Sequence, residues 1–159
     1  MAIKREHRRD LIDLVAAAFG MAVLFASLAA SAMDIGQTKT VQGLTVDIGV
    51  IPAEIVKGHP KEHPEATAHG GPPSGQYEYH LVVAIFDATT GARITDAKVE
   101  ARVSSLGLVG PQKTLEQMAI ASTITYGNYF DLPEKGPYTI DIEIERPAGR
   151  VSMEFVYER

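Results

Sequence analysis

Apolar and polar residues alternate along most of the chain after residue 32, and this period of two is the feature that most constrains its fold. Leu44, Val46, Ile48 and Val50 alternate with polar or small residues up to Pro52. Successive side chains of a β-strand point to opposite faces, so this alternation predicts a strand with one buried face. Related patterns predict further strands over residues 38–41, 77–86, 97–103, 114–118, 122–130, 138–145 and 151–157. The chain after residue 32 is therefore expected to be all-β.

Turn-forming residues separate these segments in the way that antiparallel sheets require. Gly91 closes a turn that begins at Asp87, and residues 147–149 (Pro-Ala-Gly) join the last two strands as a hairpin. Residues 77–86 are apolar on both faces, which is typical of a central strand. Short strands at this spacing predict an immunoglobulin-like antiparallel β-sandwich of about seven strands.

The N-terminal 32 residues have the pattern of an export signal. An apolar run from Leu14 to Ala30 follows a basic start and ends in Ala30-Ser31-Ala32, an A-x-A cleavage site. The basic residues are Lys4, Arg5, Arg8 and Arg9. We expect residues 1–32 to be a cleaved signal helix and residues 33–159 to be the domain. The alternative is an uncleaved helix that anchors the protein in the membrane.

Charge and cysteine content exclude several classes of protein. The chain of 159 residues has a formal net charge of −5, and removal of residues 1–32 takes away four basic and three acidic residues, which leaves −6. An acidic domain is a poor partner for nucleic acid, and a cation suits it better. The chain has no cysteine, so disulfides and thiolate metal sites are excluded.

One segment, residues 58–75, does not follow the strand pattern. It is rich in Gly and Pro and contains His59, His63 and His69, three of the four histidines after residue 32. Neutral imidazole is a ligand for copper, zinc, nickel and iron, so this loop is a candidate for metal capture. A solvated loop that carries histidine without binding metal is the competing interpretation.

Two further residues outside this loop are candidate ligands. His80 lies in an apolar strand, where a buried imidazole needs a partner, either a backbone carbonyl or a metal ion. Met118 lies between strands, at the end of the segment 114–118, where a methionine is less needed for packing, and thioether sulfur favours Cu(I). Met153 alternates with Val151 and Phe155, so we expect it to fill the core.

The sequence contains few of the motifs that mark enzymes. There is no G-x-S-x-G motif and no glycine-rich phosphate loop that opens a helix. Asp141, Glu143 and Glu145 share one strand face at period two, which favours a solvated outer face over an acid/base pair. The sequence therefore predicts a protein that is not an enzyme.

Several short sequence motifs can be read together. They are Tyr79-His80-Leu81-Val82-Val83, Asp87-x-x-x-Gly91, Thr95-Asp96-Ala97-x-Val99, Met118, Tyr126-Gly127-Asn128-Tyr129-Phe130-Asp131-Leu132-Pro133 and Gly136-Pro137-Tyr138-Thr139-Ile140. Together these motifs resemble the YtkA-like group of exported immunoglobulin-like domains. The motifs with Met118, Tyr126-Gly127-Asn128 and Leu132-Pro133 are also similar to periplasmic iron-uptake accessory proteins with a copper site of Met and His ligands.

The resemblance implies an exported β-sandwich that handles copper, or iron together with copper. Met118 matches the methionine of the accessory proteins, and His80 matches a strand histidine. Those proteins have a histidine just before the Tyr-Gly pair, whereas this chain has Thr125. A loop histidine would have to replace the missing ligand.

These observations support two main hypotheses, and an enzyme with a redox-active copper centre is a third. The first is a periplasmic metal-binding protein that assists metal transport or delivery, with copper as the metal and iron or zinc as the other candidates. Its ligands would be His80 and Met118 on the sandwich, with His59, His63 and His69 from the loop. The second is an interaction module that binds a membrane transporter or partner subunit without metal. In either case, exposed edge strands would allow pairing into a homodimer.

Overall fold

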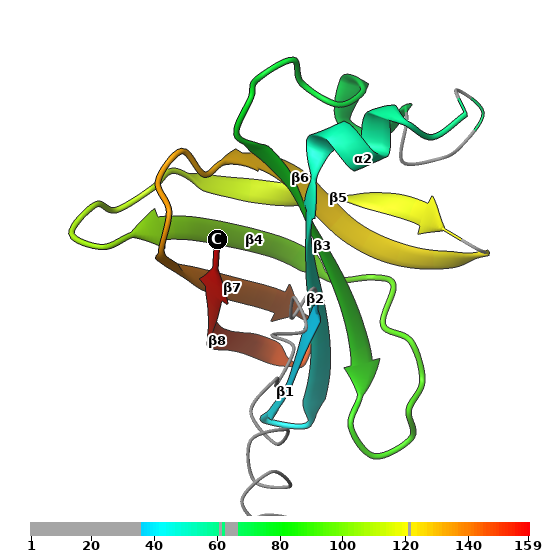
Figure 1. Ribbon diagram of the computed structural model, residues 1–159. Coiled ribbons are helices and arrows are strands. Elements are labelled where there is room, and N and C mark those ends of the chain that lie inside the picture. Colours follow the sequence, from blue (N-terminus) through cyan, green and yellow to red (C-terminus); the bar gives the residue numbers. More distant parts are fainter. Residues whose placement is uncertain (1–35, 61, 63–66, 121) are drawn as a thin grey trace, which may run out of the picture. The chain divides into compact units, whose positions relative to one another are not determined.

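The alternating segments form antiparallel strands, as predicted. The computed structural model describes residues 36–60, 62, 67–120 and 122–159, and within these ranges eight strands pair in the order β1-β2-β3-β6-β5-β4-β7-β8 (Figure 1). The strands are β1 (Gly36–Val41), β2 (Leu44–Pro52), β3 (Glu78–Asp87), β4 (Lys98–Ser105), β5 (Gln112–Ile120), β6 (Thr123–Asp131), β7 (Pro137–Arg146) and β8 (Gly149–Glu158). The all-β prediction is confirmed. The predicted signal helix over residues 1–32 lies outside the described residues.

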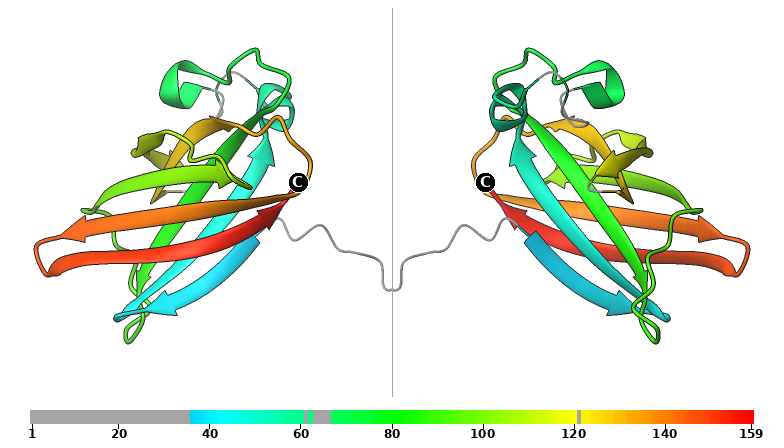
Figure 2. Two further views of the ribbon diagram at one scale, coloured as in Figure 1. Left: turned by 90° about the vertical axis from the view of Figure 1, so that its left-hand side faces the viewer. Right: turned by 90° about the vertical axis from the view of Figure 1, so that its right-hand side faces the viewer.

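Strand β5 joins two halves of the sheet, one formed by β1, β2, β3 and β6 and the other by β4, β7 and β8. Its first residues, 112–115, pair with β4, and its remaining residues, 116–120, pair with β6. The strand therefore passes from one half of the sheet to the other, and the half with β2 and β3 crosses over the half with β7 and β8 (Figure 2). The predicted immunoglobulin-like pair of separate sheets is not confirmed, because the eight strands follow one continuous order.

The two outer strands approach each other without forming a ladder. The side chain of Gln37 on β1 donates to the backbone carbonyl of Val156 on β8, and Lys39 Nζ donates to the carbonyl of Glu154. Long polar side chains thus satisfy carbonyl groups that an edge strand would otherwise leave open.

The core lies between the inner faces of the two halves. Apolar residues at every second position of β2, β7 and β8 are buried there, including Leu44, Ile142 and Phe155. Met153 is only 7% exposed and belongs to this core, which confirms its predicted packing role. Removal of this apolar surface from water is the main source of the domain's stability.

Strand β3 lies between β2 and β6, so the prediction of a central strand is confirmed. Its two faces differ, however. Leu81, Val83 and Ile85 are buried in the core, whereas Val82 and Ala84 on the other face are only half-buried. The apolar character of both faces therefore does not correspond to equal burial of both faces in that part of the strand. His80, which shares the outer face with Val82 and Ala84, is nevertheless fully buried.

The connection between β2 and β3 carries the two short helices of the described part of the chain. α2 (Ala53–Lys57) follows β2 directly, and the 3-10 turn η1 (Ala68–Gly70) comes shortly before β3. Neither is long enough to produce a helical period in the sequence. No helix among the described residues has the length and apolar character needed to cross a membrane.

Candidate metal centre

A group of side chains gathers on the outer face of three neighbouring strands, β3, β6 and β5. His80 pairs with Tyr129, and Gly127 pairs with Glu116. Because directly paired residues share a face and every second residue returns to it, Met118 lies on this same face, two residues beyond Glu116. The pairing register therefore brings His80 on β3 and Met118 on β5 to opposite sides of β6.

Gly127 provides the space between these two side chains. A Cβ atom at this position would lie 2.6 Å from Met118 Cε, 2.9 Å from His80 Nε2 and 2.9 Å from the backbone oxygen of Leu81. Real Cβ contacts are essentially never this short, so no side chain fits here. The glycine thus lets a thioether and an imidazole adjoin the same small space.

His69, from the turn η1, lies over this face and contacts β5 through both ring nitrogens. Its Nε2 atom is 3.1 Å from Met118 Sδ, and its Nδ1 atom is 2.9 Å from Glu116 Oε2. The centroid of its ring lies 5.4 Å from that of His80. The side chain of His69 is only 4% exposed. A loop residue has therefore become part of a buried cluster of potential ligands.

His80 is the most unusual member of this cluster. Its side chain is 0% exposed, and neither ring nitrogen has a hydrogen-bond partner among the described residues. Burial, and secondarily the charge of His69, lowers its pKa from 6.5 to about 4. The imidazole is therefore neutral at physiological pH. Buried polar groups are normally paired, so a neutral imidazole with two open nitrogens fits a metal ligand.

Tyr129 holds both imidazoles from the side of β6. Its ring stacks on His80 with the centroids 4.6 Å apart and an angle of 23° between the planes. It meets His69 edge-on, with centroids 6.0 Å apart and an angle of 80°. These contacts limit the orientations that the two imidazoles can adopt.

The structure thus brings together three of the five predicted ligands: His69, His80 and Met118. His59 follows α2, is half-buried and makes none of the contacts given above. His63 lies outside the described residues. Sequence reasoning missed Glu116 and Tyr129, although the strand pattern already placed Glu116 on the same face as Met118.

Two imidazoles and a thioether are donor groups that soft metal ions favour. Among the described residues, no three His, Asp or Glu side chains form a group able to hold a metal ion. A site here therefore needs the thioether of Met118 beside the two imidazoles, and this combination suits copper, above all Cu(I). The donor set and the unpaired nitrogens of His80 fit copper.

Thr125, the position at which the resemblance implied a histidine, is bonded to Arg93. It pairs with Met118 across the β5–β6 ladder. Its hydroxyl oxygen accepts from Arg93 NH2 (3.2 Å), while Arg93 Nε donates to the carbonyl of Ile124 (2.8 Å). The position is thus tied to Arg93, and His69 from the loop lies beside Met118 instead.

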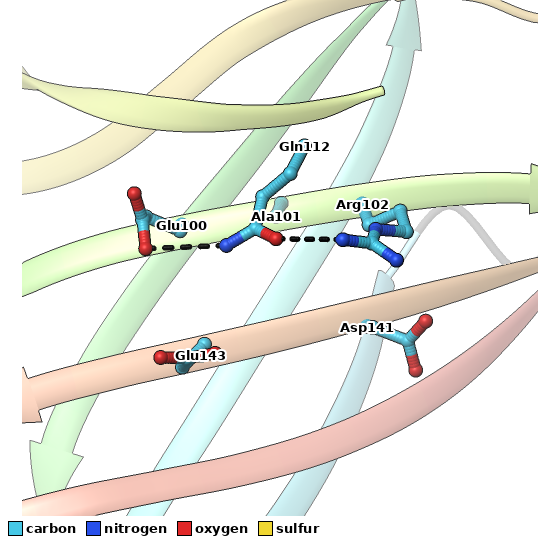
Figure 3. A pocket seen from close by; sticks show the side chains of 6 residues that line it. All are labelled: Glu100, Ala101, Arg102, Gln112, Asp141 and Glu143. Atoms are coloured by element: carbon cyan, nitrogen blue, oxygen red, sulfur yellow. Dashed lines mark hydrogen bonds between the residues drawn. The ribbon is translucent and has the colours of Figure 1, made fainter. Parts of the chain in front are cut away.

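A second polar depression lies on the outer face of β4 and β7 (Figure 3). The side chains that line it are hydrogen-bonded to one another. Gln112 donates from Nε2 to Glu100 Oε2 (3.2 Å), and its Oε1 atom accepts from Arg102 Nη2 (2.8 Å). Asp141 on this face is exposed and Glu143 is half-buried. This agrees with the predicted solvated face.

Comparisons with known proteins show what the fold resembles. No family model and no curated protein matches the chain. Among solved structures, a DUF4426 family protein from Pseudomonas aeruginosa PAO1 is similar, with a TM-score of 0.61, 17% identity and coverage of 79% of this chain and 95% of that one.

FetP from uropathogenic Escherichia coli strain F11, expressed in the periplasm, has a TM-score of 0.60 and 13% identity and covers 79% of this chain and 93% of its own. A copper-bound variant of FetP, with a single substitution, has a TM-score of 0.60 and 12% identity over 79% and 90% of the two chains. At these identities the likeness is one of fold, and the chain shares the fold of these proteins.

Proposed function

We propose that this protein is an exported, periplasmic metal-binding protein that takes up copper at His69, His80 and Met118 and assists its transport or delivery. The observation that carries the proposal is the fully buried His80, whose two ring nitrogens have no hydrogen-bond partner among the described residues. It adjoins Met118 across Gly127, where no other side chain fits.

Two further points support the assignment. A variant of FetP, whose fold is similar, has a copper-bound structure. The donor set of two imidazoles and a thioether is softer than the carboxylate-rich sites that magnesium, calcium or manganese favour. Membership of the YtkA-like group stays a prediction, as does the absence of enzymatic activity.

A competition titration against a chromophoric copper chelator tests the proposal. We expect one copper ion per chain and an affinity that falls by at least about 100-fold in His80→Ala, because loss of a direct ligand costs more than loss of an outer partner. His59→Ala is the matched control and should bind like the unmodified protein. A protein that binds no copper, as an interaction module would, or a His80→Ala variant with full affinity would contradict it.

A further inference from the structure

We propose that Glu116 is a positioning residue, which holds His69 so that its Nε2 atom is presented to the metal beside Met118. This inference rests on the proposed function. In the contacts described above, Glu116 touches one member of the site, the imidazole of His69. The inference gives this residue a role in holding that imidazole.

The hydrogen bond between the Glu116 carboxylate and the His69 imidazole determines which ring nitrogen carries the hydrogen. A carboxylate only accepts hydrogen bonds, so the 2.9 Å contact between Glu116 Oε2 and His69 Nδ1 requires a hydrogen on Nδ1. The thioether sulfur of Met118, 3.1 Å from Nε2, is also only an acceptor and a weak one, so the charged carboxylate decides which nitrogen of the neutral ring carries the hydrogen and leaves the lone pair on Nε2. The carboxylate thus favours the tautomer in which the Nε2 lone pair of His69 lies beside the sulfur of Met118, so that both atoms can bind the same metal ion.

The exposure of the two side chains separates a positioning role from direct ligation. The side chain of Glu116 is 61% exposed, whereas that of His69 is 4% exposed. The carboxylate therefore lies at the rim and reaches inward only through the imidazole. Carboxylates that orient a metal-bound histidine in this way fix its tautomer and raise its basicity.

The location of His69 on a loop explains why such a partner matters. A ligand on a loop loses conformational freedom each time it binds, which weakens affinity. Glu116 and Met118 are two residues apart on β5 and contact both nitrogens of the ring. The strand therefore orders the imidazole before the metal arrives.

A double-mutant cycle on copper affinity tests the assignment. Glu116→Ala should weaken copper binding by about 10-fold or more, within the range known for outer partners of metal-bound histidines. Glu116→Gln keeps an acceptor oxygen and should restore most of the affinity. In a His69→Ala background, Glu116→Ala should cost less than about 2-fold, because its effect passes through the imidazole. Glu154→Ala, an exposed carboxylate on β8, is the control.

Nitrogen NMR of the metal-free protein provides a second readout that a purely structural role would not move. We expect His69 to carry its hydrogen on Nδ1 in the unmodified protein and to become a mixture of tautomers in Glu116→Ala. An unchanged tautomer together with unchanged affinity would overturn the inference. So would an equal cost in the His69→Ala background, which would make Glu116 a direct ligand. If the unmodified protein bound no copper, the proposed function would fail, while the NMR result would still decide whether Glu116 orients His69.

Discussion

His80 makes the stability of the metal-free protein depend on pH. Its pKa in the folded protein is about 4, against 6.5 as the ordinary value, chiefly because the ring is buried. Between these two values the unfolded chain binds more protons than the folded one, so acid favours unfolding. The contribution of His80 to stability is fully present above pH 6.5 and is lost as the pH falls toward 4.

We expect this loss to reach about 3 kcal/mol, since each unit of pKa corresponds to about 1.4 kcal/mol. Chemical denaturation at a series of pH values, for the unmodified protein and for His80→Leu, isolates the contribution of this group. The difference in unfolding free energy between the two proteins should change across pH 4 to 6.5. A difference that is constant over this range would show that His80 is not buried in its neutral form.

In the proposed site, the thioether of Met118 is the donor that favours Cu(I) over Cu(II). Met118→Leu keeps the volume of the side chain but removes the sulfur, so Cu(I) affinity should fall by at least about 10-fold while Cu(II) affinity changes less. Met153→Leu makes the same chemical change in the core and should leave copper affinity unaltered. Competition titrations with chelators specific for each oxidation state measure both effects. Equal losses in the two variants would indicate a general change in packing.

Single residues were predictable where their chemistry alone singled them out. His80 and Met118 are conspicuous in their strands, and both lie at the site. Glu116, Gly127 and Tyr129 were not predicted, because their importance depends on the register between β5 and β6 and between β6 and β3. The period of two in the sequence predicts which face of its strand a residue occupies. It does not predict which residue of the neighbouring strand lies opposite.

At the scale of elements, the site combines three strands with one turn of a loop. Of the loop histidines in the described part of the chain, His69 alone contacts Met118 and His80 in the interactions given above. His69→Ala should therefore reduce copper affinity clearly more than His59→Ala or His63→Ala. It should cost less than His80→Ala, since the strand ligand is held rigidly in the metal-free protein.

Isothermal titration of these four variants, and of the triple loop variant that combines His59→Ala, His63→Ala and His69→Ala, ranks these effects under one set of conditions. If all three loop variants lost affinity equally, the loop would act as a flexible capture segment. His69 on η1 would then contribute no more to copper binding than the other loop histidines. If only the triple loop variant lost affinity and His80→Ala did not, the site on the sheet would be wrong.

The strands themselves were largely predictable, since alternation marks a strand wherever one face is buried. The division of β5 was not, because Gln112–Leu115 and Glu116–Ile120 differ in their partners and not in their pattern. This one strand turns the predicted pair of sheets into a continuous order. The apolar outer face of β3 was also misleading, since Val82 and Ala84 remain only half-buried.

On the scale of the whole molecule, the core and the site lie on opposite faces of the sheet formed by β3, β6 and β5. Leu81 and Phe130 pack in the core, while His80 and Tyr129 face the site. The domain should therefore fold without metal, and chelator-treated protein should melt cooperatively. Copper at about 100 times its dissociation constant should add about 2.7 kcal/mol of stability.

Calorimetry with and without chelator measures both quantities. Loss of the cooperative transition on metal removal would make the metal part of the folding core, as in small zinc domains. A transition that copper does not shift would mean that the folded protein has no copper site.

X-ray absorption at the copper edge of the Cu(I)-loaded protein tests the donor set most directly, because it distinguishes sulfur from nitrogen scatterers around the metal. The site formed by His69, His80 and Met118 predicts one sulfur scatterer and two imidazoles, with the sulfur absent from Met118→Leu. A first shell of nitrogen and oxygen alone in the unmodified protein would contradict the proposed site.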